Sequence, residues 1–241
     1  MIAALLGLWM GATADPTPRA PSSPPLRIDD AETVEAGHAE LNLSVGGVYG
    51  RSGWEAEAPL VDANLGVSPH VHINAELPLV QTGPPAHAGL GQAAVAVKWQ
   101  ALRGARGALA VHPALALPAF PKGAADPGAQ AALTIPVVGD LALGAAGTGL
   151  GLELARTFAA DPAEGGWEAM AGLATPVAEA ADLMVDYAQE AGPTGAPGEG
   201  WLEVGFVQDH LFGRDPVALF AAGALSTEAQ RALTIGVQIG I

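Results

Sequence analysis

The last ten residues decide the fold, and they read Ala232-Leu233-Thr234-Ile235-Gly236-Val237-Gln238-Ile239-Gly240-Ile241. Every odd-numbered position is Leu, Ile or Val, and the positions between them hold Ala, Thr, Gly, Gln and Gly. Successive side chains of a β-strand point to opposite faces. The pattern therefore predicts a strand with one wholly apolar face and one small or polar face.

The same alternation recurs along the chain from His38 onward. Apolar residues take one parity in the segments 41–45, 71–79, 95–99, 109–117, 183–187 and 202–206. Turn-forming clusters separate these segments, among them Arg51-Ser52-Gly53, Gly83-Pro84-Pro85 and Asp126-Pro127-Gly128. The chain is therefore predicted to be all-β, an antiparallel up-and-down transmembrane β-barrel of about 12 strands (about 10–14).

The segment from Trp54 to Val67 departs from strict alternation near Pro59. Glu55 and Glu57 occupy odd positions, whereas Asp62 and Asn64 occupy even ones. Proline cannot donate a hydrogen bond to a neighbouring strand, so we expect a β-bulge at this point.

The residues between the apolar positions distinguish a membrane barrel from a soluble one. A soluble barrel fills its interior with bulky apolar side chains and exposes many Lys and Glu. Here the second parity holds mostly Gly, Ala, Thr, Asn and scattered carboxylates, with few lysines. This composition favours a crowded, water-containing lumen, and Trp54, Trp99, Trp167 and Trp201 lie at strand ends, where interfacial aromatic belts belong. A soluble exported β-protein that binds a ligand stays the alternative.

The composition narrows the possible partners. A net charge of −15 makes binding to a phosphate backbone unfavourable, so no nucleic-acid partner is expected. The chain has no cysteine, which excludes disulfides and thiolate metal sites. Beyond the first residues we find no apolar run of eighteen, so no helix is expected to span a bilayer.

The N-terminus predicts export. Residues 1–14, MIAALLGLWMGATA, form an apolar segment that ends in small residues, as in a signal peptide cleaved after Ala14. Residues 15–37 read as a Pro-rich linker and N-terminal segment, extended and unpaired as far as Arg27, and residues 38–241 as the barrel. The predicted location is the bacterial outer membrane.

Several short motifs resemble a known family. The opening segment Ile28 to Leu41, IDDAETVEAGHAEL, is followed by Glu76-Leu77-Pro78-Leu79, Gly89-Leu90-Gly91-Gln92, Val97-Lys98-Trp99 and Leu115-Ala116-Leu117-Pro118. In order and spacing these motifs resemble the phenol-degradation meta-pathway transporter family, although Gln92 stands where that family has Asp. The resemblance implies an outer-membrane barrel that passes hydrophobic or aromatic compounds.

The polar residues of the inward parity are the candidate lumen-lining set. They are Glu40, Asn42, Asp62, Asn64, His72, Asn74, Glu76, Lys98, Glu153, Asp182, Asp186 and Glu203. Charges on the lipid face cost several kcal/mol at mid-depth, so these carboxylates are expected inside. A negative lumen would favour cations or neutral solutes over anions; alternatively, the carboxylates are merely solvated and have no selective role.

No catalytic machinery is evident. His70, His72 and Glu76 share one strand parity, but two histidines at a turn and a strand start are better explained without a metal. We therefore predict no enzyme, no cofactor and no metal. The expected function is passive passage or uptake of small, hydrophobic or aromatic solutes by a monomer in the lipid bilayer. The alternatives are a non-conducting structural membrane barrel and the soluble ligand-binding protein.

Overall fold

The computed structural model describes residues 25–51, 53–83, 87–117, 130–144, 147–161, 165–192, 197–211 and 216–241. The predicted signal peptide, residues 1–14, and residues 15–24 of the predicted linker lie outside the described residues. No helix long and apolar enough to cross a membrane occurs among the residues described.

Fourteen strands make up the described structure. They are β1 (Ala39–Gly50), β2 (Gly53–Ser68), β3 (Val71–Gly83), β4 (His87–Leu90), β5 (Ala93–Gly104), β6 (Gly107–Val111), β7 (Ala114–Leu117), β8 (Ala132–Leu143), β9 (Thr148–Ala159), β10 (Gly166–Ala178), β11 (Ala181–Ala191), β12 (Pro197–Gln208), β13 (Val217–Ser226) and β14 (Arg231–Gly240).

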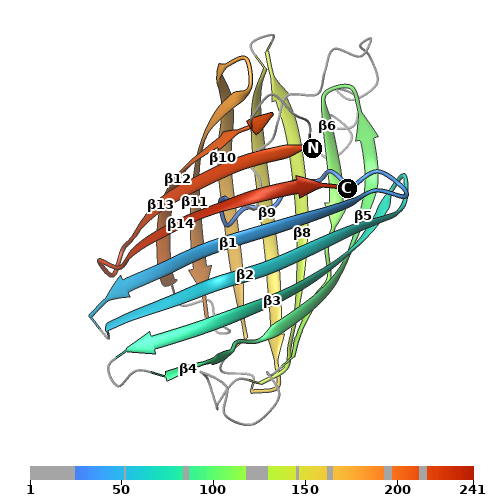
Figure 1. Cartoon of the computed structure of the whole chain (residues 1–241). Coiled ribbons are helices and arrows are strands. Elements are labelled where there is room, and N and C mark those ends of the chain that lie inside the picture. Colours follow the sequence, from blue (N-terminus) through green and yellow to red (C-terminus); the bar gives the residue numbers. More distant parts are fainter. Residues whose placement is uncertain are drawn as a thin grey trace.

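These strands form one closed antiparallel barrel (Figure 1). β4 and β5 both pair with β3, and β6 and β7 both pair with β5 and β8. Each of these two pairs is thus one wall position interrupted in the middle, at Gly91-Gln92 and at His112-Pro113, so that 14 strands less 2 give 12 wall positions. β1 pairs with β14 and closes the ring. The prediction of about 12 antiparallel strands is confirmed.

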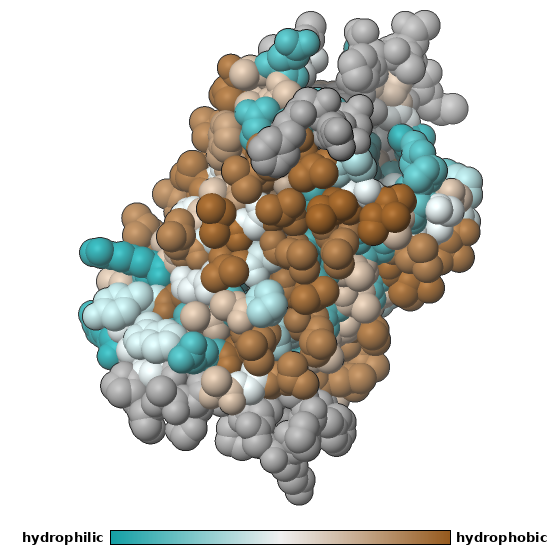
Figure 2. Space-filling model, viewed as in Figure 1, coloured by the Kyte–Doolittle hydropathy of each residue, from teal (hydrophilic) through white to brown (hydrophobic). Residues whose placement is uncertain are grey.

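The apolar parity faces outward along the whole wall. In β14, Leu233 is 65% exposed and Ile235 52%, and the corresponding parity of the other strands is exposed as well. Figure 2 shows the result as a broad hydrophobic band over the strands. A soluble barrel would bury this parity, because large continuous apolar surfaces are unstable in water. The soluble alternative is therefore inconsistent with the fold.

The predicted irregularity near Pro59 is present. The pairing register of β2 with β3 shifts between Glu57 and Leu60, and that of β1 with β2 shifts between Ser44 and Gly46. The peptide bond Ala58–Pro59 is cis. The shift lets Glu57 and Asp62 both face inward despite their opposite parities.

The aromatic prediction holds for two of the four tryptophans. Trp54 and Trp167 are exposed on the outward parity as the second residues of β2 and β10, whereas Trp99 is exposed in the middle of β5, opposite the first residue of β3. Trp201 is only 7% exposed and belongs to the inward parity of β12, so its assignment to an interfacial belt was wrong. The alternation of Leu202, Val204 and Phe206 already placed it inward.

The barrel has two rims, which we call terminal and distal. The terminal rim carries the start of β1, the end of β14 and the connections 69–70, 105–106, 144–147, 179–180 and 209–216. The distal rim carries the connections 51–52, 84–86, 118–131, 160–165, 192–196 and 227–230. The sequence predicts the longer loops at 121–129, 161–165 and 192–200, and the first two of these belong to the distal rim and lie largely outside the described residues. The third, 192–200, is shorter than expected because β12 already begins at Pro197.

Candidate functional site

A segment of the chain itself lies inside the barrel. Residues 25–37, which we call the inner segment, precede β1, and Leu26, Ile28 and Ala31 within it are at most 3% exposed. Sequence reasoning treated this part of the chain as belonging to an N-terminal linker outside the barrel. The expectation of an unpaired chain up to Arg27 does not hold for Arg27, whose N–H is hydrogen-bonded to the wall.

Wall side chains accept hydrogen bonds from successive backbone N–H groups of the inner segment. Arg27 N donates to Glu203 Oε2 (2.9 Å), Ile28 N to Asp186 Oδ2 (3.2 Å), Asp29 N to Glu153 Oε2 (2.9 Å) and Ala31 N to Asp140 Oδ2 (2.6 Å). The four carboxylates belong to β12, β11, β9 and β8. An extended chain without strand partners needs such acceptors, because a buried N–H without a partner is costly.

Further along the chain, the inner segment lies against the opposite side of the lumen wall. Val34 N donates to His72 Nδ1 at 3.2 Å, so His72 is neutral and carries its proton on Nε2. Gly37 N donates to the carbonyl of Gly66, and Gly66 N donates to that of His38. A Cβ at Gly66 would lie 2.0 Å from the carbonyl oxygen of Glu35, so only glycine allows the segment to pass so close to β2.

A buried cluster of charges holds the middle of the segment. Lys98 Nζ lies 2.8 Å from Asp29 Oδ1 and 3.6 Å from Asp30 Oδ1, and its side chain is 5% exposed. The other Asp29 oxygen lies 2.7 Å from His112 Nδ1. Burial by itself would raise the pKa of Asp29, but Lys98 and His112 hold it below its usual range. Burial raises the pKa of Asp30, and the attraction of Lys98 opposes this only in part.

Arg27 is the one positively charged residue of the inner segment. Its guanidinium lies 3.4 Å from Glu190, 3.8 Å from Glu168 and 4.0 Å from Glu203. It also stacks over the ring of Trp201, with 5.3 Å to the ring centroid. Three carboxylates from three neighbouring strands thus surround one cation of the segment.

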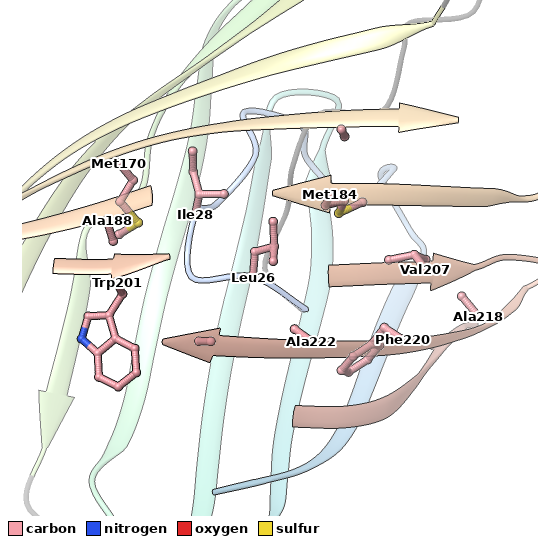
Figure 3. Close-up of a cluster of buried hydrophobic side chains, with 12 residues drawn as sticks. Leu26, Ile28, Met170, Met184, Ala188, Trp201, Val207, Ala218, Phe220 and Ala222 are labelled. Carbon is pink, nitrogen blue, oxygen red and sulfur yellow. The ribbon is translucent and has the colours of Figure 1, made fainter. Parts of the chain in front are cut away.

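The side chains of Leu26 and Ile28 pack against an apolar part of the lumen wall (Figure 3). Met170 of β10, Met184 of β11 and Phe220 of β13 form this surface with several alanines. Leu26 also lies above Gly205, where a Cβ would come within 2.8 Å of its Cδ2. One side of the lumen is therefore a small hydrophobic core.

A polar cavity of about 560 Å³ remains between the inner segment and the rest of the wall. Side chains of β1, β2 and β3 form a hydrogen-bonded network beside it: Asn42 Nδ2 donates to Asp62 (2.8 Å), and Asn74 Nδ2 donates to Asn64 (3.0 Å) and to Asp62. Glu40 and Glu76 line the cavity next to this network. These neutral amide donors stabilise the Asp62 carboxylate by hydrogen bonds and leave its negative charge in place.

The candidate lumen residues differ in what they contact. Seven of them line the polar cavity: Glu40, Asp62, Asn64, His72, Asn74, Glu76 and Lys98. Asn42 is buried beside it, Glu153, Asp186 and Glu203 bind the inner segment, and Asp182 lies on the inward parity of β11 near the terminal rim. His70 lies in the turn before β3 and is exposed, apart from His72. Among the described residues no three His, Asp or Glu side chains are grouped as metal ligands.

Sequence reasoning missed several residues of the site. Asp140 and Glu168 follow the inward parity of their strands, so the alternation could have identified them. His112 was noted only as part of an alternating segment. Asp29, Asp30 and Arg27 carried no signal, because nothing in the sequence shows that residues before the first strand fold back into the barrel.

Comparison with known proteins supports the fold at low sequence identity. No protein-family model matches the chain, and no curated protein matches it either. Solved structures do: the COG4313 outer membrane channel from Pseudomonas putida F1 has a TM-score of 0.66 and 10% identity, and the match covers 90% of this chain and 100% of that one. The KdgM porin (TM-score 0.62, 8% identity) and the NanC porin (0.61, 7%) each match over 83% of this chain and 98% of theirs.

The fold is therefore that of an outer-membrane β-barrel of the porin and channel type. At 7 to 10% identity, the likeness to the COG4313 channel and to the two porins is one of fold. The residues of its own lumen therefore indicate the function of this chain.

Proposed function

We propose that the protein is a passive outer-membrane channel for small solutes, through which passage requires the inner segment to shift. One observation carries the proposal: a segment of the chain crosses the lumen beside a polar cavity of about 560 Å³ and is held by side-chain contacts instead of strand pairing. Water can replace such contacts one at a time, as in other wet polar interfaces.

The lumen charge supports passage of cations and neutral solutes over anions. Glu40, Asp62 and Glu76 line the cavity; of its cations, Lys98 and the segment's own Arg27 are each paired with carboxylates, and Arg103 lies exposed at its border. Rings of carboxylates favour cations in other channels. In planar bilayers with a salt gradient, the reversal potential is expected to show cation preference, and anion preference would contradict this part of the proposal.

Aromatic or hydrophobic compounds are the solute class that we infer from the resemblance to the phenol-degradation meta-pathway transporters. Neutral phenols combine an apolar ring with a hydroxyl group that the amides of Asn64 and Asn74 could bind. Swelling of liposomes that contain the protein, measured with small phenols and with sugars of similar size, tests this inference. Equal rates for both would leave the channel unselective and remove the aromatic class.

A disulfide between the inner segment and the wall tests whether movement is needed. Ala31 packs in one cluster with Ala108, Ala110 and Val138, and Ala31 and Ala110 are both fully buried. The chain has no cysteine, so the pair Ala31→Cys with Ala110→Cys forms the only disulfide. Oxidised protein is expected to pass solutes more slowly than the same sample after reduction, with Ala110→Cys alone as the control.

The two other outcomes are equally clear. Identical flux before and after reduction would show that solutes pass without movement of the segment. No flux in either state would favour the alternative, a non-conducting structural barrel. We also propose that the channel is a monomer, which light scattering of the detergent-solubilised protein can test.

A further inference from the structure

The outer surface of the barrel has an unusual distribution of charge. Among strand residues whose side chains are described, the acidic groups and Lys98 follow the inward parity. The two charged side chains of the outward parity are Arg156 of β9 and Arg231 of β14. A protein with a net charge of −15 thus presents only positive charge on the described lipid-facing strand surface.

Both arginines lie near the distal rim. Arg231 is the first residue of β14, and Arg156 lies three residues before the end of β9. Exposed aromatic residues surround them, namely Tyr49, Trp54, Phe158 and Trp167. Figure 2 shows hydrophilic and intermediate side chains gathered beside the hydrophobic band at the left-hand ends of β14, β1 and β2. Near the terminal rim, by contrast, Trp99 and Phe206 are exposed on this parity without a charged neighbour on it.

Arg231 borders a groove of about 340 Å³ in the outer surface. Gly47 and Ala56 form its floor, and Tyr49, Trp54, Arg231 and Leu233 stand around it. Tyr49 is paired with both Trp54 and Arg231 across the sheet, so the three side chains stand in one row with Tyr49 in the middle. Val48, Glu55 and Ala232 also line the groove but belong to the inward parity of their strands, and no described carboxylate forms an ion pair with Arg231.

Arg156 shows the same chemistry elsewhere on the distal rim. Its guanidinium carbon lies 5.3 Å from the ring centroids of both Phe158 and Trp167. No described carboxylate pairs with it either. Two separate arginines on strands that are not neighbours, each next to aromatic side chains, indicate a property of this rim and not of one position.

The position of these cations limits their partner. An arginine on the lipid face costs about 2–4 kcal/mol at the bilayer midplane and about 0–1 kcal/mol near the interface, so these side chains belong at headgroup level. Guanidinium groups bind phosphate through paired hydrogen bonds, and aromatic side chains favour the same depth. The longest connection, 118–131, lies at the distal rim, which is therefore the outer side of the membrane.

We propose that the groove beside Arg231 binds a phosphorylated lipid of the outer leaflet. The phosphate pairs with the Arg231 guanidinium beside Tyr49, and an acyl chain lies over the small residues Gly47 and Ala56. Arg156 pairs with a second lipid phosphate at the same depth. This inference concerns the outer surface and goes beyond the proposed channel function.

Native mass spectrometry of the full chain in detergent tests the proposal, with diphosphorylated lipid A as the probe and its dephosphorylated form as the comparison. Wild-type protein is expected to retain the phosphorylated lipid preferentially. Arg231→Gln is expected to weaken its binding about tenfold, the effect of losing one charge-assisted contact. Ala56→Phe keeps the charge and fills the groove, and it should weaken binding to a similar extent.

Two controls make the result decisive. Arg106→Gln removes a cation from the turn between β5 and β6 at the terminal rim and should leave binding unchanged. Heat-modifiable gel mobility shows whether each variant is folded. Equal binding of the two lipid forms, wild-type binding by both Arg231→Gln and Ala56→Phe, or displacement of the lipid by millimolar inorganic phosphate would each overturn the proposal.

Discussion

The two halves of the lumen wall hold the same segment by different means. From β10 to β13 the wall offers an apolar surface, including Met184 and Phe220, to Leu26 and Ile28, and two of its carboxylates, Asp186 and Glu203, accept backbone N–H groups there. From β3 across to β9 it offers His72, Lys98, Asp140 and Glu153 to backbone N–H groups and to Asp29. Residues 28–30 of the inner segment lie where its contacts change from mainly apolar to polar.

This difference separates two tasks. Apolar burial is non-directional, so the contacts of Leu26 and Ile28 favour an inserted segment without fixing which residue lies where. Hydrogen bonds and ion pairs demand particular atoms, and so the β3–β9 side sets the register together with Asp186 and Glu203 of β11 and β12. Once the segment leaves, water can form hydrogen bonds with the polar side chains of the wall, whereas exposing the apolar side chains to water is unfavourable in free energy. We therefore expect the apolar half to keep the segment inside and the polar half to position it.

Loss of Lys98 is expected to have the largest effect. Lys98→Met leaves Asp29 with His112 as its ion-pair partner and leaves Asp30 with the N–H of Glu32, and breaking a buried pair costs about 3–5 kcal/mol. The readout is the rate at which a water-soluble maleimide labels Ala31→Cys, a fully buried position. Labelling should become at least about a hundredfold faster.

A compensating variant separates the charge from the packing. Adding Asp29→Asn to Lys98→Met removes one unpaired carboxylate and should recover much of the protection. Arg103→Met, which removes an exposed cation bordering the same cavity, is the matched control. Fast labelling in the control as well would mean that general lumen charge, not the Lys98 pair, positions the segment.

Truncation of Ile28 tests the apolar half. Ile28 is fully buried, and Ile-to-Ala changes in cores cost about 2–5 kcal/mol. We expect about 2 kcal/mol here, because water can enter the lumen and relieve part of the cavity. Labelling of Ala31→Cys should then accelerate by about thirtyfold. Glu35→Gln, an exposed change on the same segment, should not alter the rate, and an unchanged rate in Ile28→Ala would deny the apolar half its retaining role.

The barrel could be predicted because alternation is a local property of each strand. The alternation from Leu233 to Ile241 predicts which face contacts lipid. The parity change between Glu57 and Asp62 predicts the bulge of β2. Closing twelve wall positions into a ring requires no information beyond repeated hairpins. Trp201 faces the lumen because its parity is opposite to that of Leu202 and Val204, so parity predicts its position better than proximity to a turn does.

The inner segment could not be predicted because its partners are distant in sequence and its backbone makes most of the bonds. Ile28 N meets Asp186 across 158 residues, and any residue type except proline supplies the same N–H group. The carboxylates of the wall were recognised as inward-facing, but their periodicity does not distinguish solvated groups from acceptors of a chain. Glu153, Asp186 and Glu203 are three such carboxylates, each an acceptor for the inner segment.

Glycine substitutions compare the two halves at the closest approaches. At Gly66, on the polar side, a new Cβ would meet the backbone carbonyl of Glu35 at 2.0 Å, and the segment must shift. At Gly205, on the apolar side, it would meet the flexible end of Leu26 at 2.8 Å and the ring of Pro25 at 3.0 Å. Gly66→Ala is expected to cost about 1–3 kcal/mol and Gly205→Ala less. Gly223→Ala, whose Cβ has space, is the control for the same labelling assay.

The pH dependence of the segment should be the smallest effect, and it has two opposite parts. Asp30 has a raised pKa, so its ionisation opposes insertion, and this opposition disappears as the pH falls through the raised value. Asp29 has a lowered pKa, so the stability that it contributes is present above the ordinary Asp value of 3.8 and is lost only as the pH falls below that value. Mild acidification should therefore not release the segment through these two groups.

Asp30→Asn isolates this contribution, because it removes the ionisation while it keeps the shape of the side chain. Conductance of the bilayer-reconstituted wild type and variant, recorded from pH 7 down to pH 4, is expected to converge at the acidic end. At neutral pH the variant should conduct less, since its segment is held more firmly. A variant that conducts more than the wild type at neutral pH would show that the Asp30 charge helps Lys98 to hold the segment. In that case the polar half would retain the segment as well as position it.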